Sequence, residues 1–284
     1  MVFDVLLISV TIIALSIASF SDIKRREVPD WLSYGLIFVA LGLRTIFSFQ
    51  LGWTILLNGI IGFIFCLGFA YLFYYTGQWG GGDSKLLMAM GAIIGISYPF
   101  QSSSLNLLWF FLALLFLGAI YGVVWMFFTA LKRRKIFWPQ FVKALRNYNK
   151  MHLLLGIITI IFIAATFWKS FLWPLIAFPL GLFYLFLFVA VVEESCFFKM
   201  VSVTDLTEGD WLARSVVADK KIVLKKKTLT ESDLELLEKL RKSGKVRKVL
   251  LKEGIPFIPS FLLAYLLLTF GKPLIMFVLE KSFF

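Results

Sequence analysis

Long apolar runs alternate with short polar segments along most of the 284-residue chain. A helix needs about 20 apolar residues to cross a hydrocarbon core of ~30 Å. The pattern therefore predicts an all-α polytopic membrane protein, in contact with a lipid bilayer, with six to eight transmembrane helices. Eight are favoured, although the sixth and seventh runs could instead form one re-entrant hairpin. The eight runs are 3–20, 32–49, 53–76, 84–98, 107–131, 151–167, 172–192 and 256–271.

The positions of Lys and Arg predict how these helices are oriented. Cytoplasmic loops of membrane proteins collect basic residues. With the N-terminus outside and eight spans, 25 of the 29 Lys and Arg residues fall in the inside loops. Orientation and contact with anionic lipid then account for the net charge of +12, so no nucleic-acid partner is predicted. The basic and aromatic loop 132–150 is expected to lie on the inner membrane surface.

Residues 193–255 differ in composition, with 14 basic and 11 acidic side chains among 63 residues. They predict a small cytoplasmic module of mixed α/β structure. Within it, residues 221–229 alternate as a strand does, and a capped amphipathic helix is expected between Thr230 and Gly244. The predicted organisation is a transmembrane core over 1–192, this module over 193–255, and a final transmembrane helix with a C-terminal tail over 256–284.

The chain holds few of the side chains that bind metals or act as nucleophiles. Cys66 lies in an apolar run and Cys196 in a charged region, so both are predicted to be free thiols. The single histidine, His152, opens an apolar run, where an interfacial or structural role is expected. No metal and no cofactor are predicted.

Carboxylates are also scarce, with only five before residue 190. Asp4 is expected to be solvated, whereas Asp22 ends the first span and Asp83 begins the fourth. Two crossings separate Asp22 from Asp83, so both should lie at the same membrane face. If they meet, the pair shares one proton, and one member activates water while the other protonates the substrate carbonyl. An acid pair at one face of such a chain favours a catalytic function.

A simpler reading of each aspartate stays open. A glycine-rich turn followed by Asp83 is an ordinary helix start, and Asp22 could be a boundary residue beside Lys24. The three glycines at 80–82 also permit tight backbone and the close approach of a substrate strand. The helix dipole is expected to favour the ionised form of Asp83.

Two segments, SDIKRREVP (21–29) and GGGDSK (80–85), resemble the paired signatures of the type IV prepilin peptidases and their archaeal relatives, the preflagellin peptidases. Segment 254–261, GIPFIPSF, is similar to the Pro-Phe-x-Pro start of that family's last helix. The resemblance covers residues 1–98 and the final span, and no motif places residues 107–192. The residues that match the two signatures are Asp22, Lys24 and Pro29, and Gly80, Gly82, Asp83 and Lys85.

The resemblance implies a membrane-embedded aspartic endopeptidase that removes short basic leader peptides from pilin-like or archaellin precursors at the cytoplasmic face. It implies Asp22 and Asp83 as the catalytic pair. The paired Cys-x-x-Cys loop of bacterial members is missing from the sequence, which favours the archaeal type without N-methylation. Glu27 and Asp30 are the nearby acids that could receive a basic leader, although pairing with Arg25 or Arg26 is the simpler expectation.

Two other functions compete with this one. Intramembrane proteases of the presenilin type also use Gly-x-Gly-Asp, but their Tyr-Asp and Pro-Ala-Leu motifs are not visible in the sequence. A non-enzymatic transporter or assembly factor could use Asp22 and Asp83 to carry protons or cap helices. Transporters place ionisable groups near the bilayer midplane, whereas these two lie at an edge.

Overall fold

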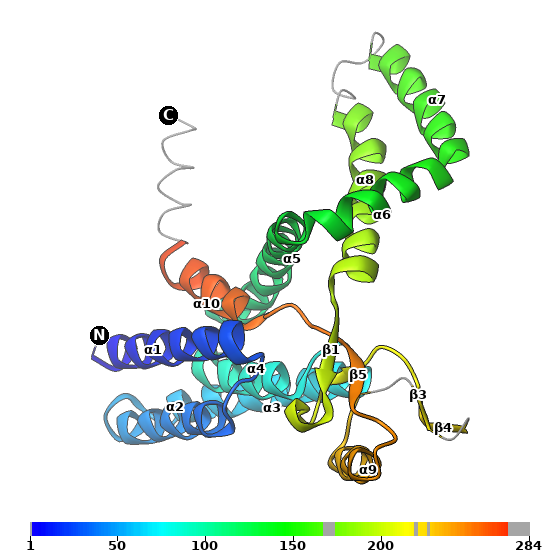
Figure 1. Ribbon diagram of the computed structural model, residues 1–284. Coiled ribbons are helices and arrows are strands. Elements are labelled where there is room, and N and C mark those ends of the chain that lie inside the picture. Colours follow the sequence, from blue (N-terminus) through cyan, green and yellow to red (C-terminus); the bar gives the residue numbers. More distant parts are fainter. Residues whose placement is uncertain (1, 167–173, 219–220, 226–227, 272–284) are drawn as a thin grey trace. The chain divides into compact units, whose positions relative to one another are not determined.

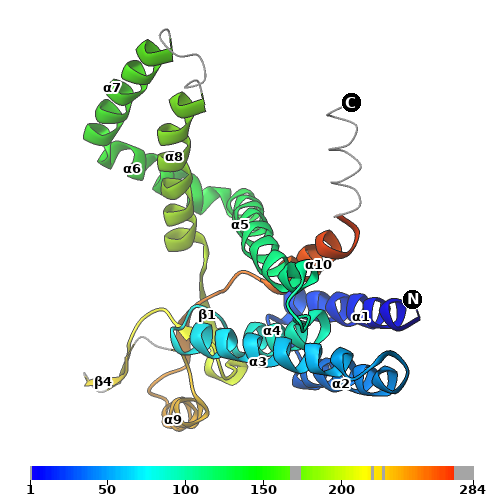
Figure 2. The same ribbon diagram turned by 180° about the vertical axis from the view of Figure 1, so that it is seen from behind.

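The computed structural model describes residues 2–166, 174–218, 221–225 and 228–271, and most of them are helical (Figures 1 and 2). The chain divides into two compact units. The first comprises residues 1–122 and 255–284, and the second comprises residues 123–254. The first unit thus joins the beginning of the chain to its end, and it holds both aspartates of interest.

Six helices are long and apolar enough to cross a membrane, which confirms a multi-pass membrane protein within the predicted range of six to eight spans. The expected fourth and eighth spans also form helices, but both are shorter than those six. The fourth, α4 (Gly81–Ile94), stops early because Gly95 adopts a positive φ of 71°. The eighth consists of α10 (Ile258–Leu266) and a π-helical turn, η4 (Leu267–Gly271). The six long helices are α1 (Val2–Arg25), α2 (Asp30–Leu51), α3 (Thr54–Tyr75), η1 (Ser102–Leu105) continued by α5 (Asn106–Lys132), α7 (Asn149–Thr166) and α8 (Pro174–Cys196).

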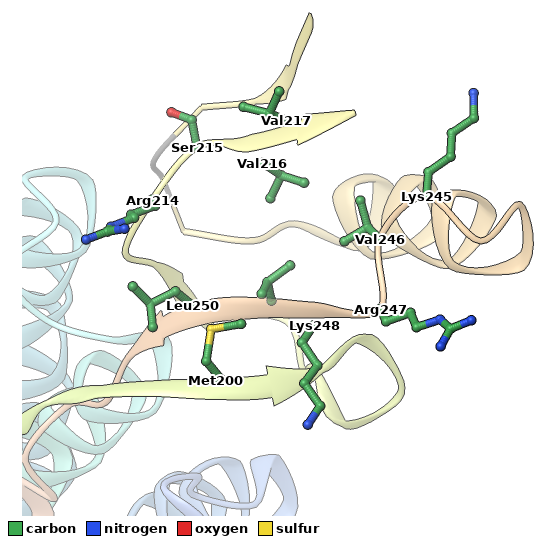
Figure 3. A pocket seen from close by; sticks show the side chains of 11 residues that line it. Met200, Arg214, Ser215, Val216, Val217, Lys245, Val246, Arg247, Lys248 and Leu250 are labelled. Atoms are coloured by element: carbon green, nitrogen blue, oxygen red, sulfur yellow. The ribbon is translucent and has the colours of Figure 1, made fainter. Parts of the chain in front are cut away.

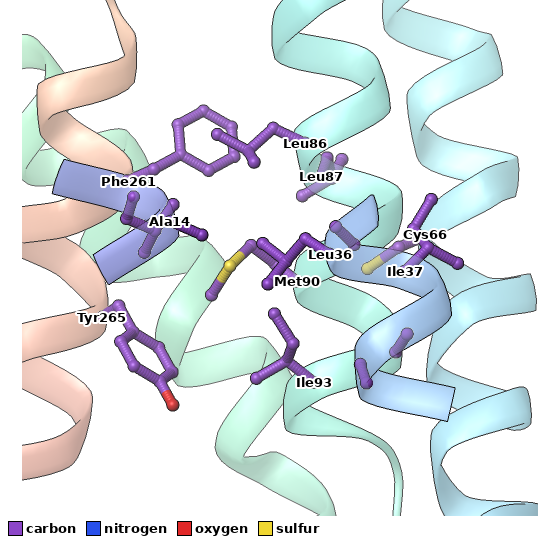
Figure 4. Close-up of a cluster of buried hydrophobic side chains, with 14 of the residues drawn as sticks. Ala14, Leu36, Ile37, Cys66, Leu86, Leu87, Met90, Ile93, Phe261 and Tyr265 are labelled. Carbon is purple, nitrogen blue, oxygen red and sulfur yellow. The ribbon is translucent and has the colours of Figure 1, made fainter. Parts of the chain in front are cut away.

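In the first unit α4 packs against α2 and α3, while α1 packs against α2 and α10. The backbones of α3 and α4 approach each other closely where a Cβ added to Gly62 would lie 2.3 Å from the carbonyl oxygen of Gly91. Only residues without a Cβ let the two backbones come this near. Figure 4 shows the buried side chains that α1, α2, α3, α4 and α10 contribute to the centre, among them Leu36, Leu86, Met90, Phe261 and Tyr265.

Arg44 of α2 is buried, with 5% of its surface exposed. Its side chain caps the C-terminal end of α4, the helix that carries Asp83. Its guanidinium donates to the carbonyl oxygens of Ala92 (2.8 Å), Ile93 (2.6 Å) and Ile55 (2.7 Å). The last carbonyls of a helix have no partner inside the helix, and here an arginine fork supplies it. This role of Arg44 was not predicted from the sequence.

In the second unit, helices α6 (Arg134–Asn147) and α7 pack against α8. The loop 132–150, which is expected to lie on the inner membrane surface, contains α6 with Pro139 inside the helix. The ring of Phe137 packs edge-on against Phe188 of α8 at 5.6 Å and so holds one side of α6 to its neighbour. His152 bridges α7 and α8 through its contact with the hydroxyl of Tyr184 at 3.2 Å, which is a structural role.

The strands belong to the second unit and form a three-stranded sheet of order β1-β5-β2 and a separate hairpin of β3 and β4. The expected strand after residue 221 is β4, and the expected helix is α9 (Glu231–Lys242). Thr230 begins α9, bonded to Asp233, and Gly244 follows it with a φ of 74°. The strands are β1 (Phe198–Ser202), β2 (Trp211–Leu212), β3 (Val216–Ala218), β4 (Lys221–Leu224) and β5 (Lys248–Lys252), and a short η3 (Val203–Asp205) follows β1.

Candidate active site

Asp22 stands one turn before the end of α1 and is buried, with 7% of its surface exposed. Its Oδ2 accepts a hydrogen bond of 2.9 Å from the backbone N–H of Ile258. That N–H is the first of α10, so the carboxylate lies at the positive end of a helix. α10 therefore orients Asp22, and its N–H favours the negative charge of this carboxylate.

Asp83 lies in the first turn of α4 and is partly buried. Its Oδ2 accepts a hydrogen bond of 3.2 Å from the backbone N–H of Gly80, the residue that begins the helix. Asp83 thus does make the helix-start contact that the simpler reading predicts. This contact occupies one carboxylate oxygen and holds the side chain in a defined position.

The two carboxyl groups interact with each other. Asp83 lies outside the six long helices, and burial together with the nearby charge of Asp22 raises its pKa to about 7. The hydrogen bond from Gly80 opposes this rise but is the smaller effect. Any preference of the helix dipole for the ionised form of Asp83 is outweighed by loss of hydration and by a second negative charge. Around neutral pH the Asp83 carboxyl group therefore titrates and can hold a proton.

Three chain segments meet around these carboxyl groups: the connection between α1 and α2, the glycine segment before α4, and the start of α10. A Cβ added to Gly82 would lie 3.3 Å from the Cβ of Val28, so glycine lets these two segments approach. On the other side, the ring of Trp79 packs against Phe257 at 5.6 Å and Phe261 at 5.9 Å. Aromatic packing thus attaches the glycine segment to the start of α10.

The supporting residues of the two signatures have several different contacts. Lys85 forms an ion pair with Asp30 at 2.6 Å, across 55 positions of sequence. This contact joins the two signature segments. Lys24 lies 5.8 Å from the ring centre of Phe20, and the carbonyl of Pro29 accepts the N–H of Leu32 in the first turn of α2.

Glu27 is exposed, and its backbone carbonyl accepts a hydrogen bond of 2.9 Å from the hydroxyl of Ser21. This bond ties the start of the α1–α2 connection to the helix that precedes it. The adjacent Arg26 has a positive φ of 62°, so the chain turns sharply between Asp22 and Glu27. The carboxylate of Glu27 thus projects from a defined turn that follows Asp22 directly.

Three residues at the site were not predicted from the sequence. Ile258 contributes its backbone N–H, Trp79 contributes its ring, and Tyr121 of α5 lies near enough for its phenol to interact electrostatically with Asp22. The Pro-Phe-x-Pro pattern marked the segment of Ile258 but not its contact. Tyr121 lies in an unbroken apolar run, where nothing distinguishes it from other aromatic residues.

The described residues hold no group of three or more His, Cys, Asp or Glu side chains placed to bind a metal ion together. Cys66 and Cys196 are both buried free thiols, as the sequence predicts. Cys66 packs beside Gly91 where α3 and α4 approach, and its role there is packing.

Comparison with known proteins bears directly on this arrangement. Residues 9–123 match the family model described as the type IV leader peptidase family, and the match includes both Asp22 and Asp83. Over these residues the chain is similar to the type IV leader peptidase family. The resemblance seen in the two signatures is thereby confirmed.

Individual relatives of this leader peptidase family agree with the match. A preflagellin peptidase of Methanococcus voltae is 36% identical over 124 residues, which cover 41% of this chain and 53% of that protein. A preflagellin peptidase of Methanococcus maripaludis is 30% identical over 132 residues, covering 43% of this chain and 55% of that protein. A prepilin peptidase of Methanothermobacter thermautotrophicus is 27% identical over 175 residues, covering 56% and 45% respectively. The chain thus spans about half the length of the curated relatives that it matches.

Proposed function

We propose that this protein is a membrane-embedded aspartic endopeptidase. It removes short basic leader peptides from preflagellin-like or prepilin-like precursors at the cytoplasmic boundary of the membrane. The observation that carries the proposal is the electrostatic interaction of Asp22 and Asp83, two carboxyl groups that both lie within the matched residues 9–123. The names of the relatives support the class of substrate.

The different surroundings of Asp83 and Asp22 suggest which carboxyl group acts as the acid and which as the base. The pKa of Asp83 is raised to about 7, so in this mechanism Asp83 donates a proton to the carbonyl oxygen of the scissile bond. Asp22 is stabilised as an anion by the N–H of Ile258, so it removes a proton from the attacking water. The hydroxide adds to the carbonyl carbon and gives a tetrahedral diol.

Collapse of the diol completes the reaction. Asp22 transfers the proton that it took from water to the leaving amine nitrogen, and the carbon–nitrogen bond breaks. The diol returns its other proton to Asp83 as the new carboxyl group forms. Water is consumed, one acid and one amine are released, and the pair ends with the single proton with which it began.

The glycine segment 80–82 is the proposed binding site for the backbone of the substrate. Gly80 and Gly82 carry no side chain that would keep an extended precursor away from Asp83. Glu27 and Asp30 are the proposed partners of the basic leader. Asp30 already holds Lys85, but 63% of its side-chain surface is exposed, so a second cation can reach it.

Cleavage without N-methylation is part of the proposal, on the grounds that the sequence lacks the paired Cys-x-x-Cys loop of bacterial members. The presenilin-type alternative is disfavoured by the family match, and so is a transporter, since neither accounts for both signatures together. Mass spectrometry of the processed N-terminus, with and without a methyl donor, tests the absence of methylation. A methylated product would contradict it.

A cleavage assay tests the main proposal. The purified full chain in detergent is incubated with a synthetic precursor that bears a basic leader, and Asp22→Asn and Asp83→Asn are compared with the wild type. Each substitution should lower kcat by about 10²–10⁴-fold, because it removes one proton-transfer group and keeps the shape of the side chain. Asp4→Asn, an exposed position near the other end of α1, is the matched control and should cleave normally. Full activity in either dyad variant would refute the proposal.

A second assay tests the leader contacts alone. The double variant Glu27→Gln and Asp30→Asn should raise KM several-fold for a precursor with a basic leader, because two charge-assisted contacts are lost. A precursor whose leader carries Gln in place of Lys and Arg should show no such change. Equal KM values for both precursors would mean that the leader binds elsewhere, and the dyad assignment would stand unaffected.

A further inference from the structure

The second unit contains an open cavity of about 570 Å³ between β5 and β3 (Figure 3). Val216 and Val246 point toward its interior from the two walls, and Leu250 closes one end. Basic side chains surround its margin and extend outward: Arg214, Lys245, Arg247 and Lys248. Among the described residues that line the cavity there are four basic side chains and none that is acidic.

The hydrogen bonding of β5 shows that one part of its edge is open. Bonds from Val203 N–H to Arg247 C=O and from Glu253 N–H to Phe197 C=O link β5 to β1. Because backbone groups alternate in an antiparallel strand, the odd-numbered residues of β5 face β1 and the even-numbered residues face the other side. Lys248 therefore directs its N–H and C=O toward the cavity.

The neighbouring strand does not reach this position. β2 pairs with β5 only at Trp211 and Leu212, and the last bond runs from Ala213 N–H to Leu250 C=O at 2.8 Å. The chain then leaves the sheet and continues into β3, which pairs with β4 instead. In the described part of the chain, Lys248 has no backbone partner on this side. The cavity occupies the place where the next stretch of strand would lie.

We infer that this opening binds an extended, acidic peptide segment of a partner protein, which adds to the free edge of β5 as a short strand. An added strand is recognised by main-chain hydrogen bonds, and alternate side chains find pockets on one face. Here Lys248 supplies the main-chain donor and acceptor, the valines supply the apolar pocket, and the basic margin supplies the preference for acids. The inference is independent of the proposed peptidase activity, because it concerns a different unit of the chain.

Peptide binding to the full chain in detergent tests this inference by fluorescence anisotropy. The probe is a labelled peptide of alternating Val and Glu. It should bind saturably, while a peptide of alternating Val and Lys should not. Methylation of every second backbone nitrogen on the edge that faces β5 should abolish binding, because strand addition needs those N–H groups.

Matched variants then test whether the peptide binds in the cavity. Arg247→Glu with Lys248→Glu should weaken binding of the Val–Glu peptide by about tenfold or more, because two attractive charges become repulsive. Lys239→Glu with Lys242→Glu makes the same change of charge at exposed positions of α9 outside the cavity, and should change binding less than about twofold. Unchanged thermal unfolding shows that each variant is folded.

Three results would overturn the inference. The first is the absence of saturable binding, which would leave the basic residues as charges that merely protect an open sheet edge. The second is equal affinity for the methylated and unmethylated peptides, which would mean that charge alone attracts them. The third is displacement of the peptide by soluble dihexanoyl phosphatidylglycerol at equal concentration, which would make anionic lipid the ligand. None of these measurements requires peptide cleavage.

Discussion

The backbone N–H of Ile258 donates a hydrogen bond of 2.9 Å to Oδ2 of Asp22, across 236 positions of sequence. This hydrogen bond brings the N-terminus of α10 to the end of α1. A buried carboxylate needs such a partner, since burial without one would force it to take up a proton. α10 is therefore part of the site, although the family match ends at residue 123.

Cleavage should decline as the pH rises above about 7. Asp83 acts as the acid in the proposed mechanism and is protonated only below its raised pKa of about 7. The measurement is kcat/KM of the purified protein between about pH 5 and about pH 9. Asp4→Asn serves as the control and should give the same profile. Constant kcat/KM up to about pH 9 would assign the acid to another group.

Asp83→Asn should be more stable than the wild type at alkaline pH. Because the pKa of Asp83 is raised in the folded state, the folded protein holds this proton while the unfolded chain has released it. Stability is therefore lost as the pH rises from about 4 to about 7. Asparagine carries no charge, so its advantage in the free energy of unfolding should be on the order of 1 kcal/mol above about pH 8.

The same advantage should vanish near pH ~4, where the wild-type carboxyl is neutral in both states. Thermal unfolding in detergent at the two pH values checks this, with Asp205→Asn as an exposed control. A loss of stability in Asp83→Asn at alkaline pH would mean that the folded protein favours the charged carboxylate.

Arg44→Lys should destabilise the protein even though it keeps the charge. Lysine offers one ammonium group and cannot reach the carbonyls of Ile55, Ala92 and Ile93 with the fixed fork of arginine. Leaving one or two buried carbonyls without a donor should cost about 2–4 kcal/mol of unfolding free energy. Equilibrium unfolding in mixed micelles measures this. Arg134→Lys, at an exposed position of α6, should stay within about 0.5 kcal/mol of the wild type.

Gly62→Ala should destabilise the contact between α3 and α4, whereas Gly68→Ala in the same helix should not. A Cβ at Gly62 would lie 2.3 Å from the carbonyl oxygen of Gly91, but nothing lies within 4 Å of a Cβ at Gly68. The first substitution should cost about 1–3 kcal/mol, since the helices must move apart. The second should be neutral or slightly stabilising, because alanine favours the helix. Equal unfolding midpoints for the two variants would mean that the helices do not touch at Gly62.

Local patterns in the sequence were sufficient for most elements. Apolar runs near the length of a membrane crossing became helices, since a helix satisfies its backbone hydrogen bonds within one segment. The helix after Thr230 formed as expected, because the residues that begin and end it lie within one short segment of the sequence. α6 was missed because the side chain that holds it, Phe137, packs against a residue 51 positions away.

The sequence by itself determined that the chain is a multi-pass membrane protein and which two aspartates are candidates for catalysis. Hydrophobic length and short signatures are properties of neighbouring residues, so they can be read along the chain. Tertiary structure alone decided that Ile258 holds Asp22, that Lys85 pairs with Asp30, and that the pKa of Asp83 is raised by burial and by Asp22. Such contacts depend on distances between segments far apart in the chain, and burial changes the energy of a charge only after those segments have packed.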